Sequence, residues 1–136
     1  MRIRKIKRFI IDRKIWLRGE DDSYLLRKKD KKQCCVGIFL NACGVTKKAL
    51  RGLRTLDSNL VLRDKFLKTW QETWTKSLDS GFAQMYSVND NEITSEYVRE
   101  KAIKGLFSER GISVSFKGRK GTESRIAKIS EKSKTY

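Results

Sequence analysis

The chain has 136 residues, of which 38% are hydrophobic, which is enough for a single domain with one modest core. Thirty-two Lys and Arg against 16 Asp and Glu leave a net charge of +16. No apolar run approaches the roughly 20 residues of a transmembrane helix, and the apolar stretch in the basic start is too short for a secretory signal, so we expect a cytoplasmic protein.

The positive charge is concentrated at the two ends of the chain. Residues 1–32 carry 13 basic and 5 acidic side chains, and residues 117–136 carry 7 and 2, whereas residues 33–116 are nearly balanced with 12 and 9. Such flanks suit a polyanionic partner, because neutralised phosphates release counterions. A solubilising surface is the alternative explanation. We predict one domain over residues 1–116 and a flexible basic tail over residues 117–136.

The first part of the chain predicts two short strands and a charged loop. Residues 3–11 are rich in Ile and Phe, which favours a strand, and Asp12 then caps one helical turn over residues 13–18. A second short strand is expected at residues 23–27. The following KKDKK at residues 28–32 contains nothing apolar and predicts a loop.

The stretch QCCVGIFLNACG holds every cysteine of the chain, at Cys34, Cys35 and Cys43. On a helical wheel its apolar side chains leave only a narrow sector to Gly37 and Asn41, which predicts a nearly buried helix. Zinc binding is disfavoured because two of the cysteines are adjacent and the chain has no histidine. Since a free cysteine packs as a small hydrophobe, we predict that all three lie in the core, with a redox or nucleophilic role as the alternative.

Two helices are expected next. Thr46 precedes a short one at residues 47–51, and a longer one is predicted at residues 58–78, where apolar side chains recur every four residues. This stripe includes Trp70 and Trp74. Aromatic residues at such spacing are typical of a core face, and a base-stacking platform beside nearby lysines is the alternative.

The last elements are two helices, a turn and a strand. Residues 82–88 are expected to add a helical turn or two, and residues 89–91 a turn. A helix capped by Thr94 or Ser95 then runs to Arg110. Its expected inner face consists of Val98, Ala102, Ile103, Leu106 and Phe107.

The alternation ISVSF at residues 112–116 predicts a half-buried strand. Together these elements predict an α+β fold: a small, mainly antiparallel sheet covered by three to four helices. The sheet would combine this strand with those at residues 3–11 and 23–27.

Several short motifs occur in a characteristic order. They are KIWLRG at 14–19, SYLL at 23–26, QCCVGIFLNACG at 33–44, ALRG at 49–52, VNDN at 88–91 and REKAIKGLFSERGISVSF at 99–116. This order resembles a group of small, uncharacterised phage and prophage proteins that typically read WLRG, SYLL, CCLGF, ACG, VNDD and GIxVxF. The resemblance covers most of residues 10–116 and implies a phage or mobile-element context without an activity. This chain departs from it at Asn91, where that group often has Asp, and in its more basic ends.

The sequence offers few groups for catalysis. Without histidine, acid–base chemistry would depend on carboxylates, lysine, tyrosine or a perturbed cysteine, and there is no GxSxG, P-loop or CxxC motif. A magnesium-dependent nuclease would need clustered acids. The candidates are Glu20, Asp21, Asp22, Asp90 and Glu92. Adjacent acids in a turn are usually solvated, so we predict no enzymatic activity, no cofactor and no metal, with the nuclease as a distant alternative.

We therefore predict a non-enzymatic protein that binds nucleic acid, RNA or DNA, or a host nucleoprotein complex, by charge and shape. The residues expected to contact the partner are Arg18, Lys28, Lys29, Lys31, Lys32, Lys47, Lys48, Arg51, Arg54, Arg119 and Lys120. Lysine acts as a point charge on phosphate, whereas arginine also donates in pairs. The alternative is a phage anti-defence inhibitor of the anti-CRISPR type, which binds a host effector protein or its guide RNA.

Overall fold

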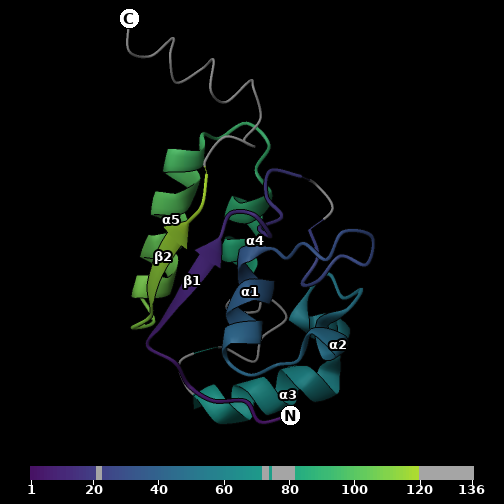
Figure 1. Ribbon diagram of the computed structural model, residues 1–136. Coiled ribbons are helices and arrows are strands. Elements are labelled where there is room, and N and C mark those ends of the chain that lie inside the picture. Colours follow the sequence, from purple (N-terminus) through teal and green to yellow (C-terminus); the bar gives the residue numbers. More distant parts are fainter. Residues whose placement is uncertain (21–22, 72–73, 75–81, 120–136) are drawn as a thin grey trace, which may run out of the picture.

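The computed structural model describes residues 1–20, 23–71, 74 and 82–119. Within these ranges the elements are β1 (Arg8–Asp12), α1 (Cys35–Ala42), α2 (Lys47–Leu50), the 3-10 turn η1 (Leu56–Ser58), α3 (Leu60–Trp70), α4 (Ala83–Asp90), α5 (Glu96–Ser108) and β2 (Ser113–Lys117). Helices and strands are therefore mixed, as the α+β prediction requires. Figure 1 shows α1 in the middle of the molecule, with the two strands and α5 on one side and α2 on the other.

The sheet of the described residues has two strands, and they are parallel. Phe9 pairs with Val114 and Ile11 with Phe116. The predicted antiparallel arrangement was therefore wrong. Parallel strands need a crossover connection, and here almost the whole chain forms it. The final part of that connection is α5, which packs on β2 and returns the chain to the end of the sheet where β1 begins (Figure 1).

The N-terminal strand is shorter than predicted: it begins at Arg8, and the last contact before it is the Lys7 carbonyl, which accepts from the Ser113 amide at 2.8 Å. Ile3 and Ile6 instead pack partly buried against the core, and the Arg4 amide donates to the Cys43 carbonyl at 2.8 Å. The two side chains are three residues apart, a spacing that does not follow the alternation of a strand.

The strand predicted at residues 23–27 is not formed, and the ladder pairing of this stretch is a single isolated bridge between Leu26 and Arg51. The single turn predicted after Asp12 is confirmed but is short: the Ile15 amide donates to the Asp12 carbonyl at 3.1 Å, and the chain extends again at Trp16. In both places a buried apolar pair provides the anchor without regular structure.

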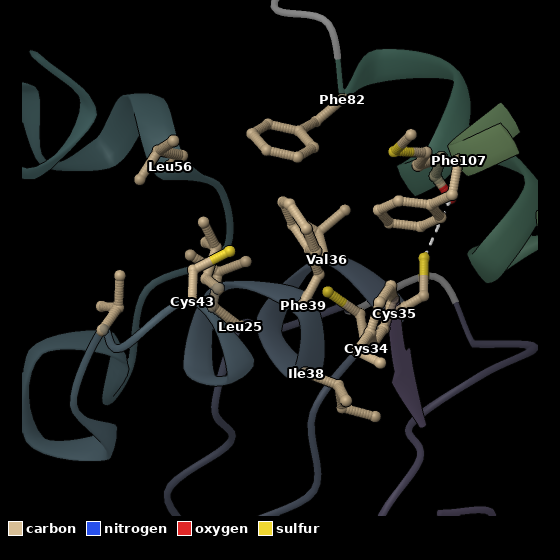
Figure 2. Close-up of a cluster of buried hydrophobic side chains, with 14 of the residues drawn as sticks. Leu25, Cys34, Cys35, Val36, Ile38, Phe39, Cys43, Leu56, Phe82 and Phe107 are labelled. Atoms are coloured by element: carbon tan, nitrogen blue, oxygen red, sulfur yellow. Dashed lines mark hydrogen bonds between the residues drawn. The ribbon is translucent and has the colours of Figure 1, made fainter. Parts of the chain in front are cut away.

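Helix α1 lies in the core, as its sequence predicts. Cys34 caps it through Sγ, which accepts from the Gly37 amide at 3.5 Å. Residues 35–40 are all buried. Gly37 is required because an added Cβ would lie 2.1 Å from the Leu25 carbonyl oxygen, so the backbone at residue 25 crosses the helix directly. In Figure 2 the thiol of Cys35 points at a neighbouring carbonyl, that of Met85 in α4.

Aromatic rings surround Phe39 of α1. Its centroid lies between 5.1 and 6.2 Å from six other rings. These belong to Phe9, Phe66, Trp70, Trp74, Phe82 and Phe107. Figure 2 shows Phe39 and Phe82 directed towards one another. Trp70 and Trp74 are 4% and 3% exposed, so the core interpretation is confirmed and the base-stacking platform is excluded for these two side chains.

The helices of the second half differ from prediction mainly in their ends. Helix α3 ends at Trp70, and the rest of the predicted helix 58–78 falls largely outside the described residues. Helix α4 continues through the expected turn at 89–91 as far as Asp90. Ser95 caps α5 as predicted, its Oγ accepting from the Val98 amide at 3.2 Å.

Helix α5 buries Ile103 and Phe107, but Val98 is 51% exposed and so leaves the predicted inner face. The strand predicted at 112–116 is observed as β2, one residue later in the chain, over Ser113–Lys117. The tail after Arg119 lies outside the described residues. No helix in the described ranges is long and apolar enough to cross a membrane.

Candidate functional site

The predicted lysine loop is a closed turn. The Arg27 amide donates to the Lys32 carbonyl and the Lys31 amide donates back to the Arg27 carbonyl, both at 2.8 Å. Lys31 adopts a left-handed conformation with φ 60°, which reverses the chain. The lysines between these bonds therefore project from a defined backbone, although nothing apolar holds the turn together.

A carboxylate clamp on Arg27 shapes this turn. Nε and Nη2 of Arg27 donate to the two oxygens of Asp30 at 3.0 and 2.5 Å, and Nη1 donates to Glu20 at 2.6 Å. Asp30 also accepts from the Lys32 amide at 3.1 Å. The hydrogen bonds from Arg27 hold the pKa of Asp30 at about 2, and the two carboxylates raise the pKa of Arg27. One guanidinium therefore offsets one of the two carboxylate charges, and the three side chains together carry a net charge of −1.

The second predicted basic segment is α2 with the residues that follow it. Thr46 caps α2, its Oγ1 accepting from the Ala49 amide at 3.3 Å. Leu50 is fully buried and anchors the segment, while Lys47 and Lys48 are exposed in its first turn. The helix has only four residues because Arg51 leaves helical geometry and pairs with another part of the chain.

Backbone hydrogen bonds join the two basic segments side by side. The Leu25 amide donates to the Leu53 carbonyl at 2.7 Å, and the Gly52 amide donates to the Leu26 carbonyl at 2.9 Å. We call the resulting set the basic surface. It consists of Lys28, Lys29, Lys31, Lys32, Lys47, Lys48, Arg51 and Arg54. All eight are exposed except Lys32, which is half-buried.

A hollow of about 410 Å³ lies where the two segments meet. It is lined by Tyr24, Arg27, Lys28, Lys29 and Gly52. The Lys28 stem crosses Gly52, since a Cβ added there would lie 2.8 Å from Lys28 Cε. An aromatic ring and the cations of the loop thus share one concavity.

Arginine holds the Tyr24 ring at this hollow. The Arg54 guanidinium lies over the ring at 5.2 Å from its centroid, and Arg54 Nη2 donates to the Tyr24 hydroxyl at 3.5 Å. Arginine stacks on aromatic faces in this way because of its planar, delocalised charge. The ring is half-buried and so keeps accessible surface.

Three of the predicted contact residues lie elsewhere. Arg18 is not available to a partner: its side chain is 8% exposed, pairs with Glu96 at 2.5 Å and lies over the Trp16 ring. Arg119 is exposed, two residues after the end of β2, and among the described residues no backbone hydrogen bond joins it to either of the two basic segments. Lys120 lies outside the described residues. The prediction for Arg18 was wrong because Glu96 of α5 is buried, and its carboxylate needs a cation as partner.

The cysteines lie in the core, as predicted. Cys34, Cys35 and Cys43 are fully buried and free. Loss of hydration raises the pKa of Cys34 to about 11 and that of Cys43 to about 12, and raises the pKa of Cys35 as well. Thiols in this state are poor nucleophiles, so the alternative of a nucleophilic role loses support.

The candidate acids for a nuclease that lie among the described residues are divided between two separate places. Glu20 is held by Arg27, while Asp90 and Glu92 line a separate open hollow at the α4–α5 turn. Asp21 and Asp22 lie outside the described residues. Across the described ranges no group of three or more Cys, Asp or Glu side chains is placed to hold a metal ion.

Sequence reasoning missed Tyr24 and Arg27, and it considered Glu20 only as a candidate metal ligand of a nuclease. The Arg27–Asp30 half of the clamp is local, because the two residues are three positions apart in the chain. The contact of Tyr24 is not local, because its partner Arg54 is thirty positions away.

Comparison with protein-family models, curated proteins and solved structures finds no match to this chain.

Proposed function

We propose that this protein binds nucleic acid, free or within a nucleoprotein complex, through the basic surface. The observation that supports this most strongly is the pairing of two lysine- and arginine-rich segments by backbone hydrogen bonds at residues 25–26 and 52–53. Charges that are dispersed in the sequence thereby become one field, which attracts phosphates at long range and releases their counterions on contact.

The acids near this surface reduce its positive charge only slightly. Glu20 and Asp30 both bind Arg27, so these three side chains together carry a net charge of −1, against the eight cations of the basic surface. Arginine and lysine then have separate roles. Arg51 can donate in pairs to phosphate oxygens, whereas the six lysines act as point charges along the backbone of the nucleic acid.

Binding to a single-stranded oligonucleotide at low and high salt tests this proposal. The variant Lys28→Gln, Lys29→Gln, Lys47→Gln, Lys48→Gln should bind at least tenfold more weakly at about 50 mM salt. Its log–log salt slope should fall by about 0.7 for each phosphate that the variant no longer neutralises. Fluorescence anisotropy measures both quantities.

The matched control removes the same number of charges elsewhere. Lys14, Lys65, Lys68 and Lys101 are exposed and lie outside the basic surface. Their replacement by Gln should leave most of the affinity intact. An equal decrease in affinity for the two variants would mean that net charge alone attracts the oligonucleotide, and the basic surface would then be rejected. A salt-resistant complex with one host protein would instead favour the anti-defence alternative.

A further inference from the structure

We propose that the hollow at Tyr24 receives one unstacked base of a single strand, with the adjoining phosphates on Lys28 and Lys29. This deepens the proposed function and rests on it. The hollow, of about 410 Å³, is lined by the ring and by both lysines. A second basic hollow, between the end of α5 and β2, is lined by Lys7 and Lys104 without any aromatic ring.

The Tyr24 ring is held in place before any base binds. Arg54 holds Tyr24 from its own segment, through the guanidinium over the ring and a hydrogen bond to the hydroxyl. A ring that is already fixed loses little conformational freedom when a base packs on it. Bases stack on aromatic side chains whatever their identity, so this contact fits a partner that is bound without sequence readout.

The phosphate positions follow from the lysines around the ring. The Lys28 stem lies across Gly52, with Nζ 3.5 Å from the position of a Cβ there, which brings the ammonium to the wall of the hollow. Lys29 is exposed beside it. Arg27 forms part of the wall but is engaged by Glu20 and Asp30, so it shapes the hollow and leaves the phosphates to the lysines.

This geometry favours a single strand over a duplex. In a duplex the bases are paired and stacked inside the helix, so that none enters a side pocket without being turned out at a cost in free energy. In a single strand a base can separate from its neighbours and stack on a protein ring. A duplex would therefore use the lysines alone.

An abasic oligonucleotide separates the base from the phosphates. It has the same backbone charges as the matched base-bearing strand but offers nothing to stack. The native protein should bind the base-bearing strand about 5- to 150-fold more tightly, the range expected for one stacked base. Tyr24→Leu should lose this preference and Tyr24→Phe should keep it, while Tyr97→Leu, an exposed tyrosine on α5, serves as the control.

The outcomes are distinguishable. Equal binding of both strands by the native protein would overturn the base pocket and leave the proposed function standing. Retention of the full preference by Tyr24→Leu would also overturn it. If neither strand binds at low salt, the proposed function itself fails. If Tyr24→Leu does not fold, the binding of the base-bearing and abasic strands to the native protein still tests the base pocket.

Discussion

Asn89 has a structural role that its place in a polar NDN stretch does not suggest. Its side chain is fully buried, and Oδ1 accepts from Trp16 Nε1 at 2.8 Å and from the Cys35 amide at 3.0 Å. Nδ2 donates to the Leu17 carbonyl at 2.8 Å and to Asp90 at 3.1 Å. One amide group thus joins the end of α4, the start of α1 and the segment after β1, and every donor and acceptor on it is used.

Replacing Asn89 by Leu should destabilise the protein strongly. Leu has the same branching and the same number of side-chain heavy atoms, but Trp16, Cys35 and Leu17 would each keep a buried polar group without a partner, at a cost of about 3 kcal/mol or more in total. Chemical denaturation measures the free energy of unfolding. The control Asn91→Ala removes one exposed hydrogen bond, to the Ile93 amide, and should cost less than about 1 kcal/mol. Similar destabilisation of the two variants would contradict this assignment.

Two glycines in helices offer a matched pair. Gly37→Ala in α1 should destabilise by about 2 to 3 kcal/mol, because its Cβ would overlap the Leu25 carbonyl and force the helix away. Gly105→Ala in α5 has no atom within 4 Å of the added Cβ and should stabilise by about 0.5 to 1 kcal/mol through helix propensity. Thermal unfolding of both variants checks the sign of each change in stability. A stabilised Gly37→Ala would contradict the close approach of the Leu25 backbone to α1.

At the scale of elements, the turn at residues 27–32 depends on its ion pair. The folded pKa of Asp30, about 2, lies below its ordinary value of 3.8. The clamp therefore stabilises the turn fully above about pH 4, and this contribution is lost as the pH falls from about 4 towards 2. Because both side chains are near solvent, high salt should weaken it.

Titration of the Asp30 carboxyl by NMR tests the clamp. The midpoint should lie near 2 in the native protein and move back towards 3.8 in Arg27→Gln, because the donor is removed. Lys29→Gln removes one charge from the same turn without touching the carboxylate and should leave the midpoint nearly unchanged. A midpoint that does not respond to Arg27→Gln would show that another group lowers the pKa of Asp30.

At the scale of the whole molecule, the arginines divide between interior and surface. Arg13 pairs with Glu100 at 2.7 Å, and Arg18 pairs with Glu96 at 2.5 Å; these four side chains are at most 10% exposed. They tie the segment after β1 to α5. Breaking such a pair leaves a buried charge without compensation, so these arginines serve the fold. The surplus positive charge is therefore presented by exposed residues such as those of the basic surface.

Much of the local structure could be predicted from the sequence. The burial of the cysteines followed from the wide apolar arc of α1, and the start of α5 followed from its capping serine. The strand β2 followed from strict alternation. These signals act within a few residues, where side-chain spacing and capping groups decide the conformation.

What the sequence by itself determined is the cationic charge, the helical periods, the buried thiols and the lysine loop. Only the tertiary structure decided the direction of β2, the inward placement of Arg18, the use of Asn89 and the joining of the loop to α2. The physical reason is the same in each case: these features depend on hydrogen bonds and ion pairs between segments far apart in the chain, such as Leu25 with Leu53 and Arg18 with Glu96. No local pattern specifies which distant backbone or carboxylate will be the partner.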